Sequence, residues 1–234
     1  MIKIYGKNCV TEAIAANSKL IAVYIQDNKD QRFLTMLDER KLKYEIVDKK
    51  QMDSLFGSNH QGYGAYREDY HIFGEELLDE IKGETKRLLV LDGIQDPHNL
   101  GAIIRSVDAF GFDGIVLPKN RSCSVNETVA HVSTGAIEHV KIAYVNSLPT
   151  FINRLKDKGY WICGTDALGT VELDAVDKDR NLAIIIGSEG FGMSKTLVKM
   201  VDYLVAIPMV GHVNSLNASV STGIVLYSLR KNKS

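Results

Sequence analysis

A strand–helix–strand pattern between residues 88 and 118 constrains the fold of this chain more than any other feature. Residues 88–91 (LLVL) form a short, continuous apolar run, as in a strand that is buried on both faces. Apolar side chains then recur at helical spacing through residues 100–110, and a second apolar run follows at 115–117. This order predicts an α/β fold with parallel strands. The polar loop 92–99 would then follow the carboxyl end of a strand, where ligands bind in open α/β sheets.

The loop 92–99 is unusually polar for a connection that serves packing alone. We expect Pro97 to exclude helix from the loop, and Asn99 to cap the helix that follows it. Together with Asp96 and Arg105, these first turns carry several groups that can bind a polar ligand.

The alternation of strands and helices continues to the end of the chain and predicts a parallel sheet with helices on both faces. Further strands are expected at 140–145, 160–164, 182–186 and 204–207, and further helices at 125–133, 148–158, 194–200 and from 220 to about 231. The first 70 residues predict a smaller α/β unit. We therefore expect a first domain at 1–72, a polar linker at 73–87 and a second domain at 88–234.

The composition excludes several classes of protein. No apolar run approaches the about 18 residues of a membrane span, and the first residues are too polar for a signal peptide. Three cysteines without a paired spacing fit a reducing cytoplasm, and the six histidines show no metal-ligand spacing, so we expect a cytoplasmic protein without a metal. A net charge of −1 argues against unspecific binding of nucleic acid. An RNA partner would have to be bound by a local basic patch, by surfaces combined in an oligomer, or through recognition of its shape.

A glycine-rich turn follows the apolar run in residues 183–194 (AIIIGSEGFGMS). Its glycines, spaced G-x-x-G-x-G from Gly187, do not fit a dinucleotide fingerprint, which disfavours a dehydrogenase. Met193 stands where a phosphate-binding loop needs lysine, which disfavours an ATPase. Two interpretations remain: a plain strand-to-helix connection with Ser194 as N-cap, or a loop whose backbone approaches a ligand and from which Glu189 projects into the site.

A third polar segment lies between the predicted strand that ends at Ile207 and the last predicted helix. Small hydroxyl and amide side chains crowd the start of that helix: Ser215, Asn217, Ser219, Ser221 and Thr222. Capping explains one or two of them, and a helix N-terminus dense in donors suits an anionic or polar ligand. Because each polar segment follows a strand of one parallel sheet, all three can converge on one edge.

These three segments, in this order, resemble the SpoU (TrmH-like) ribose methyltransferases of the SPOUT superfamily. The matching motifs are residues 96–101 (DPHNLG) with Arg105, residues 187–190 (GSEG) with Gly192, and residues 207–209 (IPM) with 215–217 (SLN). The resemblance covers residues 88–231. The segments 5–14 and 60–62 are similar to the small α/β, ribosomal-protein L30e-like RNA-binding domain of the rRNA-directed branch.

The resemblance implies a C-terminal trefoil knot, a homodimer with its sites at the interface, and S-adenosylmethionine as cofactor. By position, it implies that the cofactor is bound by Gly187, Ile207, Leu216, Thr165 and Asn217. It also implies catalytic roles for Arg105, Asn99, Glu189, Ser215 and Asn217. The family assigns deprotonation of the target hydroxyl to the arginine. A guanidinium stays protonated near neutral pH, so we expect Arg105 to bind phosphate and stabilise developing negative charge instead.

The activity implied is methyl transfer to a ribose 2′-hydroxyl of RNA, with a guanosine of large-subunit (23S) rRNA as the expected target, in free rRNA or a pre-ribosomal particle. Two alternatives stay open. One is a tRNA guanosine 2′-O-methyltransferase, and the other is a non-catalytic RNA-binding ribosome assembly factor with the same fold.

Overall fold

The computed structural model describes residues 1–26, 30–188, 190–213 and 215–231. The chain folds into two compact units. The first unit combines residues 1–70 with residues 125–139, and the second combines residues 71–124 with the chain from 140 onward. Each unit has its own sheet.

The first unit is built on a small mixed sheet with the strand order β1-β4-β2-β3. β4 pairs antiparallel with both β1 and β2, whereas β3 pairs parallel with β2. Its elements are β1 (Ile2–Tyr5), α1 (Lys7–Ala15), β2 (Leu20–Gln26), α2 (Gln31–Glu39), β3 (Tyr44–Val47), α3 (Lys49–Phe56), β4 (Tyr63–Arg67), α6 (Glu127–Val132) and the 3-10 turn η1 (Ala136–Glu138). A core of aliphatic side chains with Phe33 fills the space between the sheet and its helices.

Residues 125–139 were expected in the second domain, but α6 and η1 belong to the first unit. Arg67, at the end of β4, forms an ion pair with Glu138, and both side chains are less than a tenth exposed. Ser18 donates a second hydrogen bond to Glu138 at 2.6 Å, and the Arg67 guanidinium lies 3.6 Å from the centre of the Tyr70 ring. The two contacts of Glu138 join residues about 70 and 120 positions apart, which no local sequence pattern reveals.

The second unit contains, among the described residues, a six-stranded sheet in the order β10-β8-β9-β5-β6-β7. Every pairing in it is parallel, which confirms the predicted fold class. Its strands are β5 (Arg87–Asp92), β6 (Gly114–Pro118), β7 (Ile142–Val145), β8 (Tyr160–Thr165), β9 (Asn181–Gly187) and β10 (Tyr203–Val205). Its helices are α4 (Leu77–Glu80), α5 (Pro97–Ala109), α7 (Leu148–Asp157), η2 (Leu173–Ala175), α8 (Lys195–Val198) and α9 (Ala218–Leu229).

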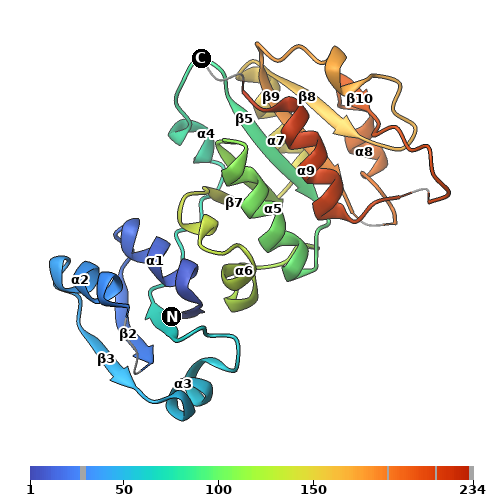
Figure 1. The fold of residues 1–234 in the computed structure, drawn as a ribbon. Coiled ribbons are helices and arrows are strands. Elements are labelled where there is room, and N and C mark those ends of the chain that lie inside the picture. Colours follow the sequence, from blue (N-terminus) through green and yellow to red (C-terminus); the bar gives the residue numbers. More distant parts are fainter. Residues whose placement is uncertain (27–29, 189, 214, 232–234) are drawn as a thin grey trace. The chain divides into compact units, whose positions relative to one another are not determined.

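Helices cover both faces of this sheet. Leu88 and Val90 of β5 pack with α4, α7 and α8 in one core. Leu89 and Leu91 point the opposite way, because side chains alternate along a strand, and they are equally buried. α5 and α9 contact each other and lie side by side across one face of the sheet (Figure 1).

The segment 73–87 is part of the second unit and is not the linker that its polarity predicts. Phe73 extends the sheet beside β7, since its backbone N–H donates to Ile142 at 2.9 Å and its carbonyl accepts from Tyr144 at 3.0 Å. Leu77 and Leu78 are buried in the core. Two apolar positions in a short acidic helix, together with Phe73 before it, are enough to anchor this segment.

Arg87, the first residue of β5, is completely buried. Its guanidinium donates to the carbonyls of Leu229 at 2.9 Å, Arg180 at 2.6 Å and Lys86 at 3.1 Å, and also to that of Lys178. It therefore ties together β5, the connection between β8 and β9, and the end of α9. After β10, at one edge of the sheet, the chain returns to pack α9 against α5 and η2. The trefoil knot itself stays a prediction.

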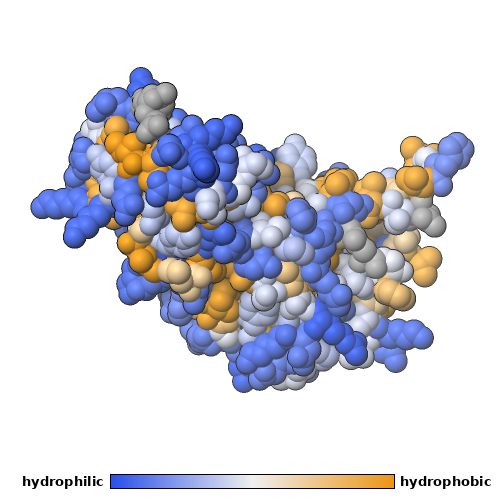
Figure 2. All heavy atoms as spheres, turned by 90° about the horizontal axis from the view of Figure 1, so that it is seen from below, coloured by the Kyte–Doolittle hydropathy of each residue, from blue (hydrophilic) through white to orange (hydrophobic). Residues whose placement is uncertain are grey.

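Some apolar side chains of the second unit reach the surface. Met209, Val210 and Val213, on the loop after β10, are exposed, and Figure 2 shows apolar atoms on that projecting loop. Val220, Ile224 and Tyr227 are exposed along α9. Their spacing of three and four residues places them on one face of that helix.

Candidate active site

The first motif lies at the start of α5, where the structure corrects two expectations. Pro97 is the first residue of the helix, a position where its missing N–H costs nothing. The N-cap is Asp96 and not Asn99, because the Asp96 carboxylate accepts from the backbone N–H of His98 at 3.0 Å. That hydrogen bond lowers the pKa of Asp96 below its usual range, so the carboxylate stays charged.

Asn99, one turn into the helix, is buried and joins the first motif to the third. The side-chain amide of Asn217 donates to the Asn99 side-chain oxygen at 2.9 Å. The Asn217 oxygen in turn accepts from the backbone N–H of Ser219 at 3.0 Å and from its hydroxyl at 2.6 Å, which makes Asn217 the N-cap of α9. The two helix starts are thus connected by one amide pair.

The second motif is a tight loop after β9. A Cβ atom at Gly187 would lie 2.1 Å from the carbonyl carbon of Gly192, so only glycine fits there. Ser188 and Gly192 exchange backbone hydrogen bonds of 3.1 and 3.0 Å. Ser194 occupies the N-cap position of α8, but its side chain makes no capping hydrogen bond, and Asp92 accepts from its backbone N–H at 2.8 Å. The backbone of this loop packs closely against itself, and the interpretation that it also approaches a ligand stays a prediction.

β8 lies next to β9 in the sheet, and β10 lies next to β8. Thr165 ends β8, pairs with Val205 and donates its hydroxyl to the Ile185 carbonyl at 3.1 Å. The following segment holds β10, since Asp166 donates to Val205 at 3.0 Å. A Cβ atom at Gly169 would lie 2.3 Å from the Val205 backbone. Ile207 and Leu216, expected to contact the cofactor, lie beyond β10 and are half-buried.

The structure brings some of the predicted catalytic residues together and leaves others apart. Asn99 and Asn217 meet directly. Arg105 is exposed on α5 and forms no ion pair with any residue of the described chain. Ser215 is exposed on the loop before α9. Glu189 lies outside the described residues.

A cavity of about 810 Å³ opens at the carboxyl ends of β5, β6, β7 and β9. The first two motifs contribute Asp96, Asn99 and the loop after β9, whereas Asn120, Arg121 and Asn146 come from the loops after β6 and β7. Sequence reasoning missed these last three residues. The rule that placed the motifs at the ends of parallel strands could have found them, because each follows a predicted strand.

Across the described chain, no three His, Cys, Asp or Glu side chains are grouped as metal ligands. No helix within those residues is long and apolar enough to span a membrane. The groups present at the strand ends are backbone groups, amides, hydroxyls, the carboxylates of Asp92 and Asp96, and an arginine.

The fold brings the first and third motifs together beside the glycine loop, and sequence comparison assigns the family. Residues 86–227 match the model of the SpoU rRNA Methylase family, and residues 3–71 match that of the RNA 2′-O ribose methyltransferase substrate binding domain. The chain belongs to the SpoU rRNA Methylase family, and the expected class of enzyme, an RNA methyltransferase, is confirmed.

Individual relatives and solved structures resemble this chain in sequence or in fold. A Staphylococcus saprophyticus protein named for the TrmH family of tRNA/rRNA methyltransferases is 41% identical over 97% of this chain and 94% of its own length. An AdoMet-bound rRNA methyltransferase from Sinorhizobium meliloti has a TM-score of 0.80 and 24% identity, over 97% of this chain and 86% of that one. A TrmH/SpoU tRNA modifying enzyme from A. aeolicus has a TM-score of 0.57 and 28% identity, over 66% of this chain and 78% of that one.

Proposed function

We propose that this protein transfers a methyl group from S-adenosylmethionine to a ribose 2′-hydroxyl of RNA, with large-subunit rRNA as substrate. The observation that carries the proposal is the hydrogen bond between Asn217 and Asn99. It joins the two helix starts that follow β5 and β10 and so supports a single site built from the first and third motifs. Gly187, at the adjacent end of β9, adds the second motif.

The strand ends fit S-adenosylmethionine through their backbone. The missing side chain at Gly187 lets the backbone of Gly192 and Met193 lie against the end of β9, which sets the conformation of the loop whose main-chain groups would bind the cofactor. Thr165, Ile207 and Leu216 would line the same edge, and Asn217 would orient the cofactor carboxylate. When bound, the cofactor supplies a methyl group that is already activated as a sulfonium.

The residues of the chain must then position the ribose and accommodate the loss of its proton. Arg105 is exposed and without an ionic partner in the described chain, so it can bind the phosphate of the target nucleotide. A guanidinium also stabilises negative charge as it develops on the 2′-oxygen. Asn99 and Ser215 would orient the ribose, and we keep Glu189 as a residue that fixes the loop or the nucleotide.

Two features favour rRNA over tRNA. The first unit matches a substrate-binding family model over residues 3–71. The tRNA modifying enzyme from A. aeolicus aligns with 66% of this chain, whereas the rRNA methyltransferase from Sinorhizobium meliloti aligns with 97%. The target within rRNA that we propose is a guanosine.

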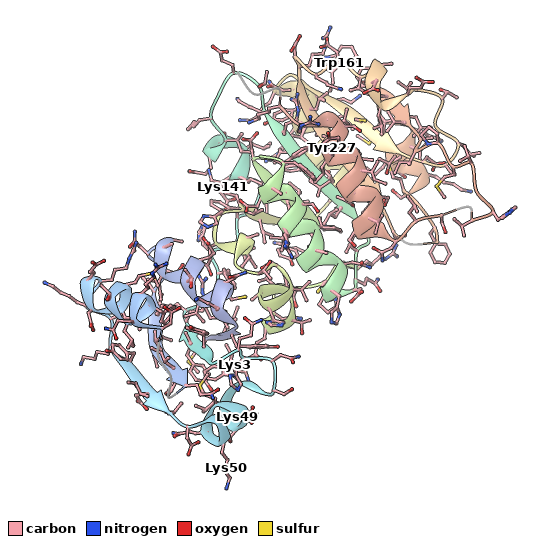
Figure 3. The ribbon with its side chains drawn as sticks, viewed as in Figure 1. Lys3, Lys49, Lys50, Lys141, Trp161 and Tyr227 are labelled. Carbon is pink, nitrogen blue, oxygen red and sulfur yellow. The ribbon has the colours of Figure 1, made fainter. Side chains whose placement is uncertain are left out.

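We also propose a homodimer that forms through α9 and α5. Val220, Ile224 and Tyr227 leave an apolar face of α9 exposed, and Figure 3 shows where Tyr227 lies on that helix. The Tyr227 ring packs edge-on against that of Phe110 at the end of α5, with 5.8 Å between the ring centres. An Ile224→Asp variant should then elute as a monomer in size-exclusion chromatography with light scattering. A dimer of unchanged mass would contradict this interface.

The function is tested by transfer of labelled methyl from S-adenosylmethionine to unmethylated rRNA and to tRNA, with Arg105→Ala and Arg105→Lys as variants. We expect label on an rRNA ribose, loss of activity in Arg105→Ala and partial retention in Arg105→Lys at all pH values. Retention by lysine only at high pH would support a base at this position. Label on tRNA alone would refute the rRNA assignment, and no label with the cofactor still bound would favour an assembly factor.

A further inference from the structure

The cavity at the ends of β5, β6, β7 and β9 extends beyond the three motifs. Asn120 and Arg121, after β6, and Asn146, after β7, belong to none of them. The residues expected to bind the cofactor through their backbone do not line it. Its volume of about 810 Å³ lies in the range of sites that enclose a nucleotide-sized ligand.

The polar side chains of this cavity are available to a ligand. Gln95, Asn120 and Asn146 are exposed, and none makes a side-chain hydrogen bond to another described residue. A carboxamide presents one acceptor and two donors, and these match the edge of an unpaired nucleobase.

Arg121 is the one cation among the described residues that line the cavity. Its backbone is in the left-handed region, with φ at 63°, which is uncommon for a residue other than glycine. The loop around it is fixed: Cys123 donates to the Ile94 carbonyl at 2.8 Å, and the Tyr144 hydroxyl donates to the Cys123 carbonyl at 2.6 Å. An arginine displayed from a fixed turn suits a phosphate group.

Phe191 lines the cavity from the loop after β9. The residue is 94% exposed to solvent. The backbone hydrogen bonds between Ser188 and Gly192 hold the loop on either side of it. An exposed aromatic ring beside unpaired amides and an arginine is the combination by which proteins bind splayed-out bases of RNA.

We infer that this cavity binds one unstacked base of the RNA substrate, with its ring on Phe191 and its phosphate on Arg121. The carboxylates of Asp92 and Asp96 also line the cavity, and their charge directs the phosphate toward Arg121. Asn120 and Asn146 then meet the edge of the base. This inference rests on the proposed function and makes these residues determinants of RNA recognition, separate from cofactor binding.

The first test is a fluorescence titration of the full-length chain carrying Trp161→Phe and Phe191→Trp. Trp161 is the only tryptophan of the sequence and lies near the amino end of β8, away from the strand ends that form the cavity (Figure 3). Transcribed large-subunit rRNA should quench the new indole, and a fully paired RNA duplex should not. Absence of quenching, with binding of the rRNA shown separately by filter retention, would overturn the inference.

The second test compares variants by methyl transfer and by calorimetric titration with S-adenosylmethionine. Phe191→Ala should raise the KM for RNA roughly 5- to 150-fold, as loss of one stacked base does, whereas Phe191→Tyr should keep it near the wild-type value. Arg121→Ala should also raise this KM, with cofactor affinity unchanged; Arg180→Ala, an exposed arginine on the β8–β9 connection, is the matched control. An unchanged KM in both Phe191→Ala and Arg121→Ala would refute the inference and leave the proposed function intact. If the wild type methylates no RNA, the proposed function fails, and the quenching titration still decides whether the cavity binds a base.

Discussion

Removal of Arg67 should destabilise the first unit strongly, because its partner Glu138 is buried. In Arg67→Met, the Glu138 carboxylate, 3% exposed, loses its ionic partner and keeps the 2.6 Å hydrogen bond from Ser18. Breaking one side of a buried ion pair costs about 3–5 kcal/mol. The stacking of the guanidinium on Tyr70 is lost as well and contributes about 1 kcal/mol more.

Urea unfolding followed by circular dichroism measures this loss, and Trp161 fluorescence reports the second unit as an internal control. The double variant Arg67→Met/Glu138→Leu should be more stable than Arg67→Met alone, since it removes both charges. Lys19→Met, which breaks an exposed pair with Glu68, should change the free energy of unfolding by no more than about 0.5 kcal/mol. A cost below about 1 kcal/mol for Arg67→Met would refute the reasoning. So would a double variant whose loss of stability equals the sum of the losses of Arg67→Met and Glu138→Leu measured singly.

Three further outcomes are expected. Gly187→Ala should reduce S-adenosylmethionine affinity at least about tenfold in calorimetry, because its methyl group collides with the Gly192 backbone and must displace the loop; wild-type affinity would contradict the cofactor assignment. Asn217→Ala should lower the free energy of unfolding by about 0.5–2 kcal/mol through loss of the α9 cap, measured by urea titration, together with a fall in kcat. Burial raises the pKa of the Cys163 thiol to about 12, so this thiol is protonated at pH 8. A thiol reagent should therefore label Cys163 at pH 8 only after unfolding, and rapid labelling of the native protein would contradict its burial.

The parallel sheet could be predicted from the sequence because its strands are continuous apolar runs. Residues 182–186 of β9, for example, are completely or almost completely buried. Such an apolar run identifies a buried strand by itself, without knowledge of the strands that pair with it. The loops after these strands could be placed at one edge for the same reason. Strand β4 (Tyr63–Arg67) was missed, since its two small residues and preceding glycine resemble a turn. Its identity as a strand depends on pairing with β1 and β2, far away in the sequence.

The predicted cap at Asn99 shows where local rules fail at a site. Asparagine is a good N-cap, and the rule is sound at Asn217, but Asp96 followed by proline competes successfully at the start of α5. Asn99 is thereby left to face a partner 118 residues later in the chain. That long-range amide pair, rather than any capping preference, is what joins the two motifs.

The buried guanidinium of Arg87 has a consequence for biosynthesis. One of its acceptors, the carbonyl of Leu229, lies 142 residues further along the chain. At about 5–20 residues per second, a ribosome adds Leu229 about 7–28 seconds after Arg87, and for that interval the first strand of the sheet lacks this acceptor. The hydrogen bond that ties this first strand to the end of α9 therefore forms only after both segments have been synthesised.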